Sequence, residues 1–326
     1  MCPVILKRIY DDKLAQASYL VGCSETSKAI VIDPNRDVEA YIEMAAASWL
    51  QIVAVTETHI HADYVSGSRE LAERTSATLH LSAEGGQDWS YGFGDATNVN
   101  LVRDGDIITV GKLRLKVVHT PGHTPEHLCF MLFDDTVGPE PCCAFTGDFI
   151  FVGDVGRPDL LERAAGIEGT MEAGARTLYR SLSKTLGFPE HLLLWPGHGA
   201  GSACGKALGD VPASTLGYER ATNWAFRHKT EEGFVQEVLS GQPEPPGYFA
   251  TMKRVNRDGP SILRGLPEPQ RVPAGRLAEI QASSAVILDI RDDAVVANGG
   301  LPGAINVPLC RSFPTYAGSV LQEGAQ

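Results

Sequence analysis

The stretch Thr56-Glu-Thr-His59-Ile-His61-Ala-Asp63-Tyr64-Val-Ser-Gly67 directly follows an apolar run, Gln51-Ile-Val-Ala-Val55. Its two imidazoles and one carboxylate occupy alternating positions, 59, 61 and 63. On an extended backbone, alternate side chains point to the same side, so we expect these three groups to converge. Imidazoles and carboxylates are common metal ligands. The stretch therefore predicts a metal site at the end of a strand.

Three further polar motifs each follow a hydrophobic, strand-like run. They are His119-Thr-Pro-Gly122-His123, Thr146-Gly-Asp148 and Pro196-Gly-His198-Gly. In this order, and together with the first stretch, they resemble the metallo-β-lactamase superfamily. The resemblance implies an α/β fold, the αββα sandwich, in which two sheets pack face to face and loops at the strand ends carry the chemistry.

The first 240 or so residues alternate strand-like runs with amphipathic helical patterns, as this fold requires. We expect a metallo-β-lactamase-fold domain over residues 1–245 and a linker over 246–274 that packs back on it. Expected strands and helices include strands over 17–22, 28–33, 113–119, 128–132, 143–145 and 191–195, and helices over 68–74, 169–186, 215–228 and 231–239.

Proline-rich segments at 242–247 and 267–273 mark the change of composition, because proline disrupts helices and strands. Beyond them, Ala285-Val-Ile-Leu-Asp289-Ile-Arg291 and Gly303-Ala-Ile-Asn306-Val-Pro308 resemble the first two strands of a rhodanese domain. Residues 275–326 would then be the N-terminal part of a rhodanese-like α/β segment without the catalytic Cys loop. Open strand edges predict that it is mobile, packed on the first domain, or paired in a dimer. We expect it to be dispensable for turnover.

Composition excludes several classes of protein. The net charge is −12 over 326 residues and no Lys/Arg-rich tract is present, which argues against a nucleic-acid partner. No apolar stretch reaches the roughly 18 residues of a membrane span. Seven cysteines without regular spacing do not form a disulfide framework. We expect a soluble, cytoplasmic protein that is a possible homodimer.

Position 64 bears on the number of metal ions. Dinuclear zinc hydrolases of the superfamily usually have H-x-H-x-D-H, and here Tyr64 replaces the last His. A neutral phenol is a poor ligand for a second zinc, so one ion is favoured. With His123, Asp148 and the Gly156-Arg157-Pro158-Asp159 loop, this change resembles the persulfide dioxygenases. The resemblance implies one Fe(II) per chain, held by His59, His123 and Asp148 as the catalytic centre.

The resemblance also implies a reaction, which is the oxidation of a low-molecular-weight thiol persulfide by O2 to sulfite or thiosulfate, in sulfide detoxification. The carrier would be glutathione or coenzyme A. Two His and one carboxylate leave coordination positions open for a sulfur substrate and O2 together, whereas zinc has no redox chemistry. Two alternatives stay open, a glyoxalase II-like metal-dependent thioester hydrolase and a non-catalytic sulfur-carrier or docking protein.

The other polar groups are assigned to the surroundings of the ion. We expect His61, Asp63, His198 and Tyr64 to orient ligands or water, and spacing does not decide whether His61 itself ligates the metal. Arg157 is expected to bind a carboxylate of the thiol carrier, or else to pair structurally with Asp154 or Asp159. Cys204 is expected to handle sulfane sulfur as a thiolate, or else to be a small buried apolar residue.

Overall fold

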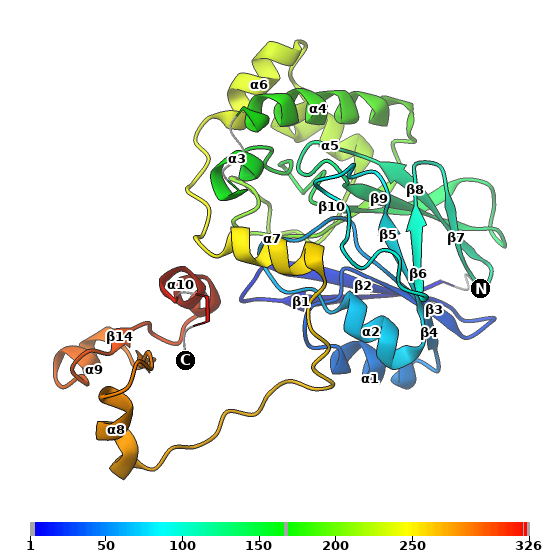
Figure 1. Cartoon of the computed structure of the whole chain (residues 1–326). Helices are drawn as coiled ribbons and strands as arrows, with labels where there is room; N and C mark the ends of the chain where they lie inside the picture. Colours follow the sequence, from blue (N-terminus) through cyan, green and yellow to red (C-terminus); the bar gives the residue numbers. More distant parts are fainter. Residues whose placement is uncertain (1–3, 166–168, 322, 325–326) are drawn as a thin grey trace.

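The structure is a computed structural model that describes residues 4–165, 169–321 and 323–324. Two six-stranded sheets pack face to face, with helices on the outer face of each (Figure 1). A smaller C-terminal segment lies beside them. The expected αββα sandwich is therefore confirmed.

The first sheet runs in chain order from β1 to β6. Its strands are β1 (Val4–Asp11), β2 (Gln16–Cys23), β3 (Lys28–Ile32), β4 (Gln51–Thr56), β5 (Thr78–Ser82) and β6 (Val99–Val102). The strands from β3 to β6 pair in parallel. Parallel neighbours need crossover connections, and helices α1 (Glu39–Ala47) and α2 (Ser68–Thr75) provide two of them on the outer face (Figure 1).

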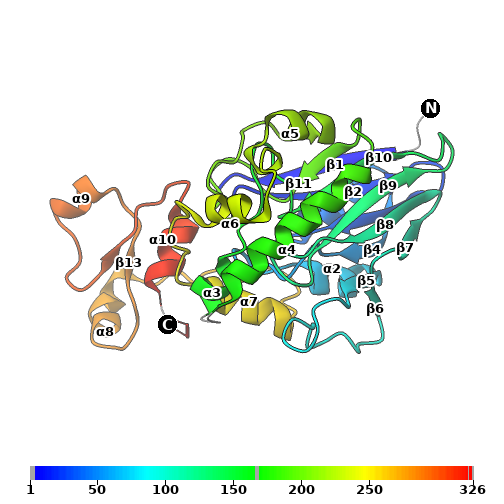
Figure 2. The ribbon, with the colours of Figure 1, turned by 90° about the horizontal axis from the view of Figure 1, so that it is seen from above.

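The second sheet has the order β12-β11-β10-β9-β8-β7. Its strands are β7 (Ile107–Val110), β8 (Leu113–His119), β9 (Leu128–Asp134), β10 (Pro141–Gly147), β11 (Leu193–Pro196) and β12 (Ser214–Thr215). Helices α3 (Leu160–Ala165), α4 (Thr170–Lys184), α5 (Leu216–Thr222) and α6 (Glu231–Leu239) lie on its side of the molecule, and α4 crosses the sheet in Figure 2.

Strand β2 illustrates how alternation builds both layers of the core. Tyr19 and Val21 point into the apolar layer between the two sheets, whereas Leu20 points into the layer beneath α1 and α2. All eight residues of β2 are buried because both of its faces are covered. The carboxyl ends of β4 and β10 consequently lie at one edge of a rigid sandwich.

One helix is shorter than expected. The helix predicted over 215–228 ends at Thr222, because Asn223 has an extended backbone with φ −68° and ψ 130°. The Asn223 amide donates to the carbonyl oxygen of Asp154 and its side-chain oxygen accepts from Ala225 N–H. These contacts satisfy the side chain outside a helix and start a 3-10 turn, Trp224–Phe226.

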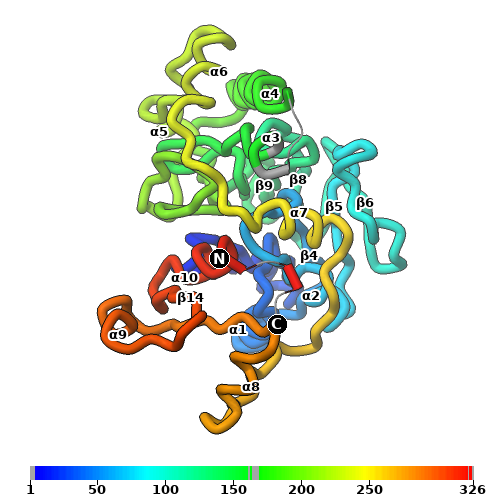
Figure 3. The backbone as a smooth tube through the Cα atoms, turned by 60° about the vertical axis from the view of Figure 1, so that its left-hand side comes forward, coloured from blue at the N-terminus to red at the C-terminus, as the bar shows by residue number. Residues whose placement is uncertain are grey.

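After the sandwich, α7 (Phe249–Asp258) lies against the first sheet's side of the molecule (Figures 1 and 3). The remaining elements are α8 (Leu277–Gln281), β13 (Leu288–Asp289), α9 (Asp293–Ala297), β14 (Ile305–Asn306) and α10 (Phe313–Val320). Strands β13 and β14 form a parallel pair within the two segments where strands were expected. No helix in the described ranges is long and apolar enough to cross a membrane.

Candidate metal centre

Three side chains from separate strand ends meet at one point. His59 follows β4, His123 follows β8 and Asp148 follows β10. The Nε2 atoms of His59 and His123 lie 3.9 Å and 3.6 Å from Oδ2 of Asp148. All three residues are at most 4% exposed. This is the ligand set inferred from the resemblance.

The hydrogen bonds of this group leave the metal-facing atoms free. Nδ1 of His59 lies 2.9 Å from Oγ1 of Thr58, and Nδ1 of His123 lies 2.9 Å from the carbonyl oxygen of Arg157. Each ring is therefore fixed through one nitrogen while Nε2 points to the shared centre. Within the described residues, the buried Oδ2 of Asp148 has no hydrogen-bond partner. An orphaned carboxylate oxygen beside two free imidazole nitrogens fits a metal ion.

Electrostatics favours the protonation states that bind metal. Burial lowers the pKa of His59 and of His123, which keeps both rings neutral. Burial alone would raise the pKa of Asp148, but His198 and the two ligand histidines hold it well below its usual range. Metal ligands must be neutral imidazoles and ionised carboxylates, and these pKa directions favour those states.

His61 does not join this centre. The expected convergence of residues 59, 61 and 63 assumed an extended backbone, but the chain leaves β4 at Thr56 and continues as a loop. Nε2 of His61 lies 3.1 Å from Oδ1 of Asp33. Burial opposes protonation, yet the Asp33 carboxylate raises the pKa of His61 to about 9. His61 is thus paired with a carboxylate behind the ligands.

Asp63 and His198 form a second pair next to the first group. His198 Nδ1 lies 2.7 Å from Oδ1 of Asp148, and its Nε2 lies 2.7 Å from Oδ2 of Asp63. Burial lowers the pKa of His198, but the two carboxylates outweigh it and raise that pKa well above the usual value. The imidazolium therefore links Asp148 to Asp63, and the other Asp63 oxygen, Oδ1, has no partner among the described residues.

Tyr64 points away from both groups. Its hydroxyl donates to the carbonyl oxygen of Asp33 and accepts from the Gln16 amide, each at 3.3 Å. Its ring packs 4.6 Å from that of His61. Burial raises the pKa of Tyr64 well above its usual value, so the phenol stays neutral. Tyr64 contributes packing where a histidine would contribute a ligand.

The expectation that Arg157 binds substrate is not supported, because its guanidinium is fully buried and already bound. It donates to both carboxylate oxygens of Asp159 and to the carbonyl oxygens of Ala203 and Pro243. The structural pair with Asp159, the alternative considered above, is the one present. Through its carbonyl oxygen, Arg157 also orients His123.

Cys204 lies beside Asp63 and His198, and one ligand atom from each falls within 4.8 Å of the others. The thiol is 2% exposed. Burial raises the pKa of Cys204 well above its usual value, and Asp148 and Asp63 add to this effect. This direction is opposite to the thiolate expected from sequence, because the thiol is buried and two carboxylates lie near it.

The sequence did not predict a role for Asp33, and it indicated Gly156 only as part of a loop. Asp33 accepts hydrogen bonds from the backbone N–H and the hydroxyl of Thr58, and thereby fixes the residue before His59. Its position after the apolar strand β3 was the available signal. Gly156 lies so close that a Cβ atom there would collide with the carbonyl oxygen of Asp148. Only glycine allows the 153–159 loop to approach the centre.

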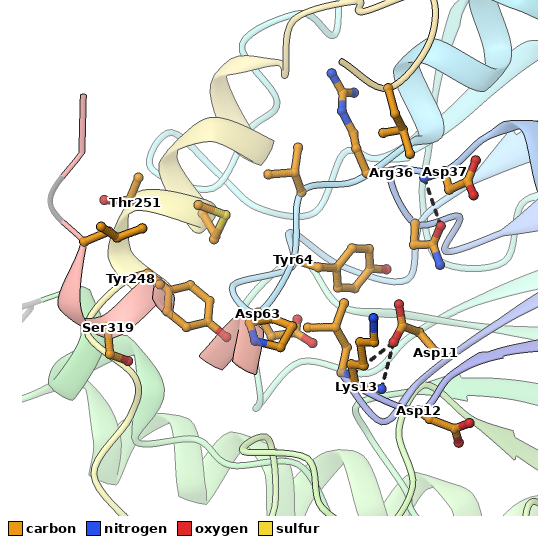
Figure 4. A pocket seen from close by; sticks show the side chains of 18 of the residues that line it. Asp11, Asp12, Lys13, Arg36, Asp37, Asp63, Tyr64, Tyr248, Thr251 and Ser319 are labelled. Carbon is orange, nitrogen blue, oxygen red and sulfur yellow. Dashed lines mark hydrogen bonds between the residues drawn. The ribbon is translucent and has the colours of Figure 1, made fainter. Parts of the chain in front are cut away.

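A cavity of about 1180 Å³ opens beside this centre. Figure 4 shows Asp63 and Tyr64 in the middle of the lining. On one side of them lie Tyr248, Thr251 and Ser319, and on the other lie Asp11, Lys13 and Arg36. Pro314, Gly318 and Leu321 from the C-terminal segment also line it. Part of this segment therefore borders the cavity, and its dispensability for turnover stays a prediction.

Comparison with known proteins fits this geometry. Residues 11–198, more than half of the chain, match the metallo-β-lactamase superfamily. The chain belongs to this superfamily. A superfamily structure from Staphylococcus aureus subsp. aureus COL, a metallo-β-lactamase by name, is 40% identical, with a TM-score of 0.87 over 98% of this chain and 89% of that one.

Two curated relatives of different activity resemble the chain over the superfamily region. Mitochondrial persulfide dioxygenase ETHE1 from Bos taurus is 29% identical over 60% of this chain and 68% of its own length. Hydroxyacylglutathione hydrolase from Polaromonas sp. is 31% identical over 60% of this chain and 66% of its own length. The superfamily fold therefore serves both an oxygenase and a hydrolase among the relatives of this chain.

Proposed function

We propose that this protein is an iron-dependent persulfide dioxygenase that oxidises a low-molecular-weight thiol persulfide with O2, giving sulfite or thiosulfate in sulfide detoxification. The observation that carries the proposal is the set of His59, His123 and Asp148, each with a free metal-facing atom. Two imidazoles and one carboxylate with open positions are typical of non-haem Fe(II) oxygenases. The likeness to ETHE1 supports the same choice.

The environment of position 64 supports one ion. A second ion beside Asp63 and His198 would gain a further ligand from a histidine at position 64, but Tyr64 directs its hydroxyl to Asp33. When bound, Fe(II) would supply the binding of O2 and of the substrate sulfur. His59, His123 and Asp148 would hold it there. No other described histidine belongs to this group.

The residues of the chain itself would hold protons and exclude water. His198 holds a proton between Asp148 and Asp63, so Asp148 keeps its charge on the side that faces the ion. Asp63 lines the cavity, and its buried Oδ1 has no partner among the described residues. Burial of the three ligands keeps bulk water from the reacting sulfur.

The test is oxygen uptake by anaerobically iron-loaded protein. Glutathione persulfide or coenzyme A persulfide is expected to drive O2 consumption and to yield sulfite. Asp148→Ala, which removes one ligand, serves as the inactive control. S-lactoylglutathione, the thioester, is expected to remain intact. Thioester hydrolysis without O2 uptake would contradict the proposal.

The second candidate is a glyoxalase II-like thioester hydrolase. Its support is the hydrolase relative from Polaromonas and the Asp63–His198 pair, which retains two side chains able to bind a further ion. Such an enzyme would use a metal-bound hydroxide. Metal analysis separates the candidates, because two zinc ions per chain favour the hydrolase and one iron favours the oxygenase.

The domain assignment is part of the proposal. We infer a metallo-β-lactamase-fold domain over 1–245, a linker over 246–274 and the N-terminal part of a rhodanese-like segment over 275–326. The parallel pairing of β13 with β14 supports the last assignment.

A further inference from the structure

We propose that the C-terminal segment forms the outer wall of the substrate pocket and selects the carrier part of the persulfide. The wall consists of Pro314, Gly318, Ser319, Leu321 and Glu323, from α10 and the residues after it. This inference rests on the proposed function in one respect, which is that the cavity beside Asp63 binds the substrate.

The cavity is larger than the reacting sulfur alone would need. Its volume of about 1180 Å³ exceeds the roughly 300–1,000 Å³ of common small-molecule sites. His59, His123 and Asp148 do not line it, but Asp63 does, and Asp63 is linked to Asp148 through His198. Ser319 of α10 borders it on the side of the C-terminal segment (Figure 4). A carrier whose sulfur lies at the metal centre would therefore extend into space that α10 encloses.

Contacts on both sides of the cavity hold this wall in place. The Nε–H group of Arg311 donates to the carbonyl oxygen of Asp12, at 2.6 Å, in the turn between β1 and β2. Its Nη2 donates to the carbonyl oxygen of Ala200, at 3.4 Å. At the other end, Glu323 forms an ion pair with Arg254 on α7. The wall thus spans from the β1–β2 turn to α7.

The closest packing within the wall joins Gly318 to Tyr248. A Cβ atom at Gly318 would lie 2.8 Å from Cδ1 of the Tyr248 ring, which itself lines the cavity. The backbone of Gly318 is helical and tolerates alanine, so the obstacle is the ring alone. Any side chain at Gly318 must displace Tyr248 or α10 and so change the shape of the pocket.

The charges of the lining indicate the class of carrier. Lys13 and Arg36 face five acidic residues, which are Asp11, Asp12, Asp37, Asp63 and Glu323. Glu70, 3.3 Å from Arg36, offsets one of the two cations. Arg254 offsets Glu323 and His198 offsets Asp63, which leaves Asp11, Asp12 and Asp37 around Lys13. An acidic pocket repels the several phosphate groups of coenzyme A more strongly than the two carboxylates of glutathione, and it attracts the glutathione ammonium group. The geometry and charge therefore point to a peptide-like thiol with a free ammonium group, such as glutathione, rather than coenzyme A.

The experiment compares two wall variants with matched controls in the full-length, iron-loaded protein. Gly318→Ala changes the contact with Tyr248, whereas Gly275→Ala adds the same methyl group where nothing lies within 4 Å. Arg311→Gln removes the links to Asp12 and Ala200, whereas Arg276→Gln removes only an exposed pair with Glu279. Steady-state O2 uptake is measured with glutathione persulfide and coenzyme A persulfide.

Wild-type protein is expected to show a kcat/KM about tenfold higher for glutathione persulfide than for coenzyme A persulfide. Both wall variants should raise KM for glutathione persulfide by about tenfold and leave iron content and kcat unchanged. This pattern is expected when a variant weakens binding of the carrier only. The two controls should match wild type. A preference for coenzyme A persulfide would contradict the assignment of glutathione as carrier. If the wall variants behave like their controls, the C-terminal segment does not form a wall of the substrate pocket.

Calorimetric titration with reduced glutathione makes the two proposals separable, since binding of the thiol needs no turnover. If wild type binds glutathione and Gly318→Ala weakens it about tenfold, the wall stands even when no persulfide drives O2 uptake. If O2 uptake is observed but all four variants bind glutathione as wild type does, the C-terminal segment does not contact the carrier. The assignment of the protein as an oxygenase is then unaffected.

Discussion

Nδ1 of His198 lies 2.7 Å from Oδ1 of Asp148, so one oxygen of the proposed metal-binding carboxylate is already committed. The other oxygen, Oδ2, faces His59 and His123 without a hydrogen-bond partner in the described residues. Partners of this kind fix the orientation of a metal ligand. His198 orients Asp148 through Oδ1, and Oδ2 stays available to bind a metal ion.

Substitution of His198 therefore tests this relationship. His198→Gln is expected to lower iron affinity about 10- to 100-fold, the usual effect of removing such a partner. Competition with a chromophoric iron chelator measures the change. His228→Gln, which removes a histidine paired with Glu237 near the surface, should leave affinity unchanged. Equal affinities for both variants would contradict the prediction.

The ligand set makes a second prediction. Purified protein prepared anaerobically is expected to contain about one iron per chain, because three ligands define one site. His59→Ala, His123→Ala and Asp148→Ala should each lose iron and O2 uptake together. Iron content is measured by elemental analysis, with His80→Ala as control because His80 lies on β5 away from this group. Any ligand variant that retains iron and activity would remove that residue from the site.

A third prediction concerns the missing second site. Tyr64→His restores an imidazole beside Asp63 and His198, and is expected to increase the metal bound to about two ions per chain. Tyr64→Phe keeps the ring packed against His61 but adds no ligand, and should remain at about one. Metal titration followed by elemental analysis distinguishes them. If both variants bind one ion, position 64 does not set the stoichiometry.

Arg157 carries a fourth prediction. Arg157→Gln leaves the buried Asp159 without its bidentate partner and is expected to lower the free energy of unfolding by about 3–5 kcal/mol. Urea unfolding of the iron-free protein measures this loss. Arg163→Gln, which removes a more exposed partner of the same carboxylate, should cost about 1 kcal/mol or less. If Arg157→Gln leaves the free energy of unfolding unchanged but raises KM, Arg157 binds substrate instead.

A fifth prediction follows from Glu126, which is fully buried. Burial raises the pKa of Glu126 to about 7, whereas the ordinary value in an unfolded chain is 4.5. Because the folded pKa is the higher one, the stability that protonated Glu126 contributes is fully present below pH 4.5 and is lost as pH rises through about 7.

Glu126→Gln keeps an acceptor for the Ile60 N–H and removes this titration. The melting temperature of the iron-free variant should therefore fall less than that of wild type between pH 4.5 and 7. Glu244→Gln is the control, because Glu244 is 87% exposed. Parallel pH profiles for wild type and Glu126→Gln would show that this carboxyl group does not titrate in that range.

The sequence determined the features that depend on local pattern. Apolar runs followed by polar motifs placed His59, His123 and Asp148 at strand ends, and strand ends in a layered fold meet at one edge. Tyr64 was identified as a change in the ligand pattern by its position alone. These conclusions needed only periodicity, residue chemistry and order along the chain.

Only the tertiary structure decided which partner each remaining group has. Loop backbone after Thr56 turns His61 to Asp33, and the compact loop around Gly156 buries Arg157 against Asp159. Burial, together with the carboxylates of Asp148 and Asp63, raises the pKa of Cys204, whereas a thiolate was expected from sequence. Arg311 and Asp12 are 299 residues apart in the chain yet touch, so the wall of the cavity depends on long-range packing that local sequence pattern does not encode.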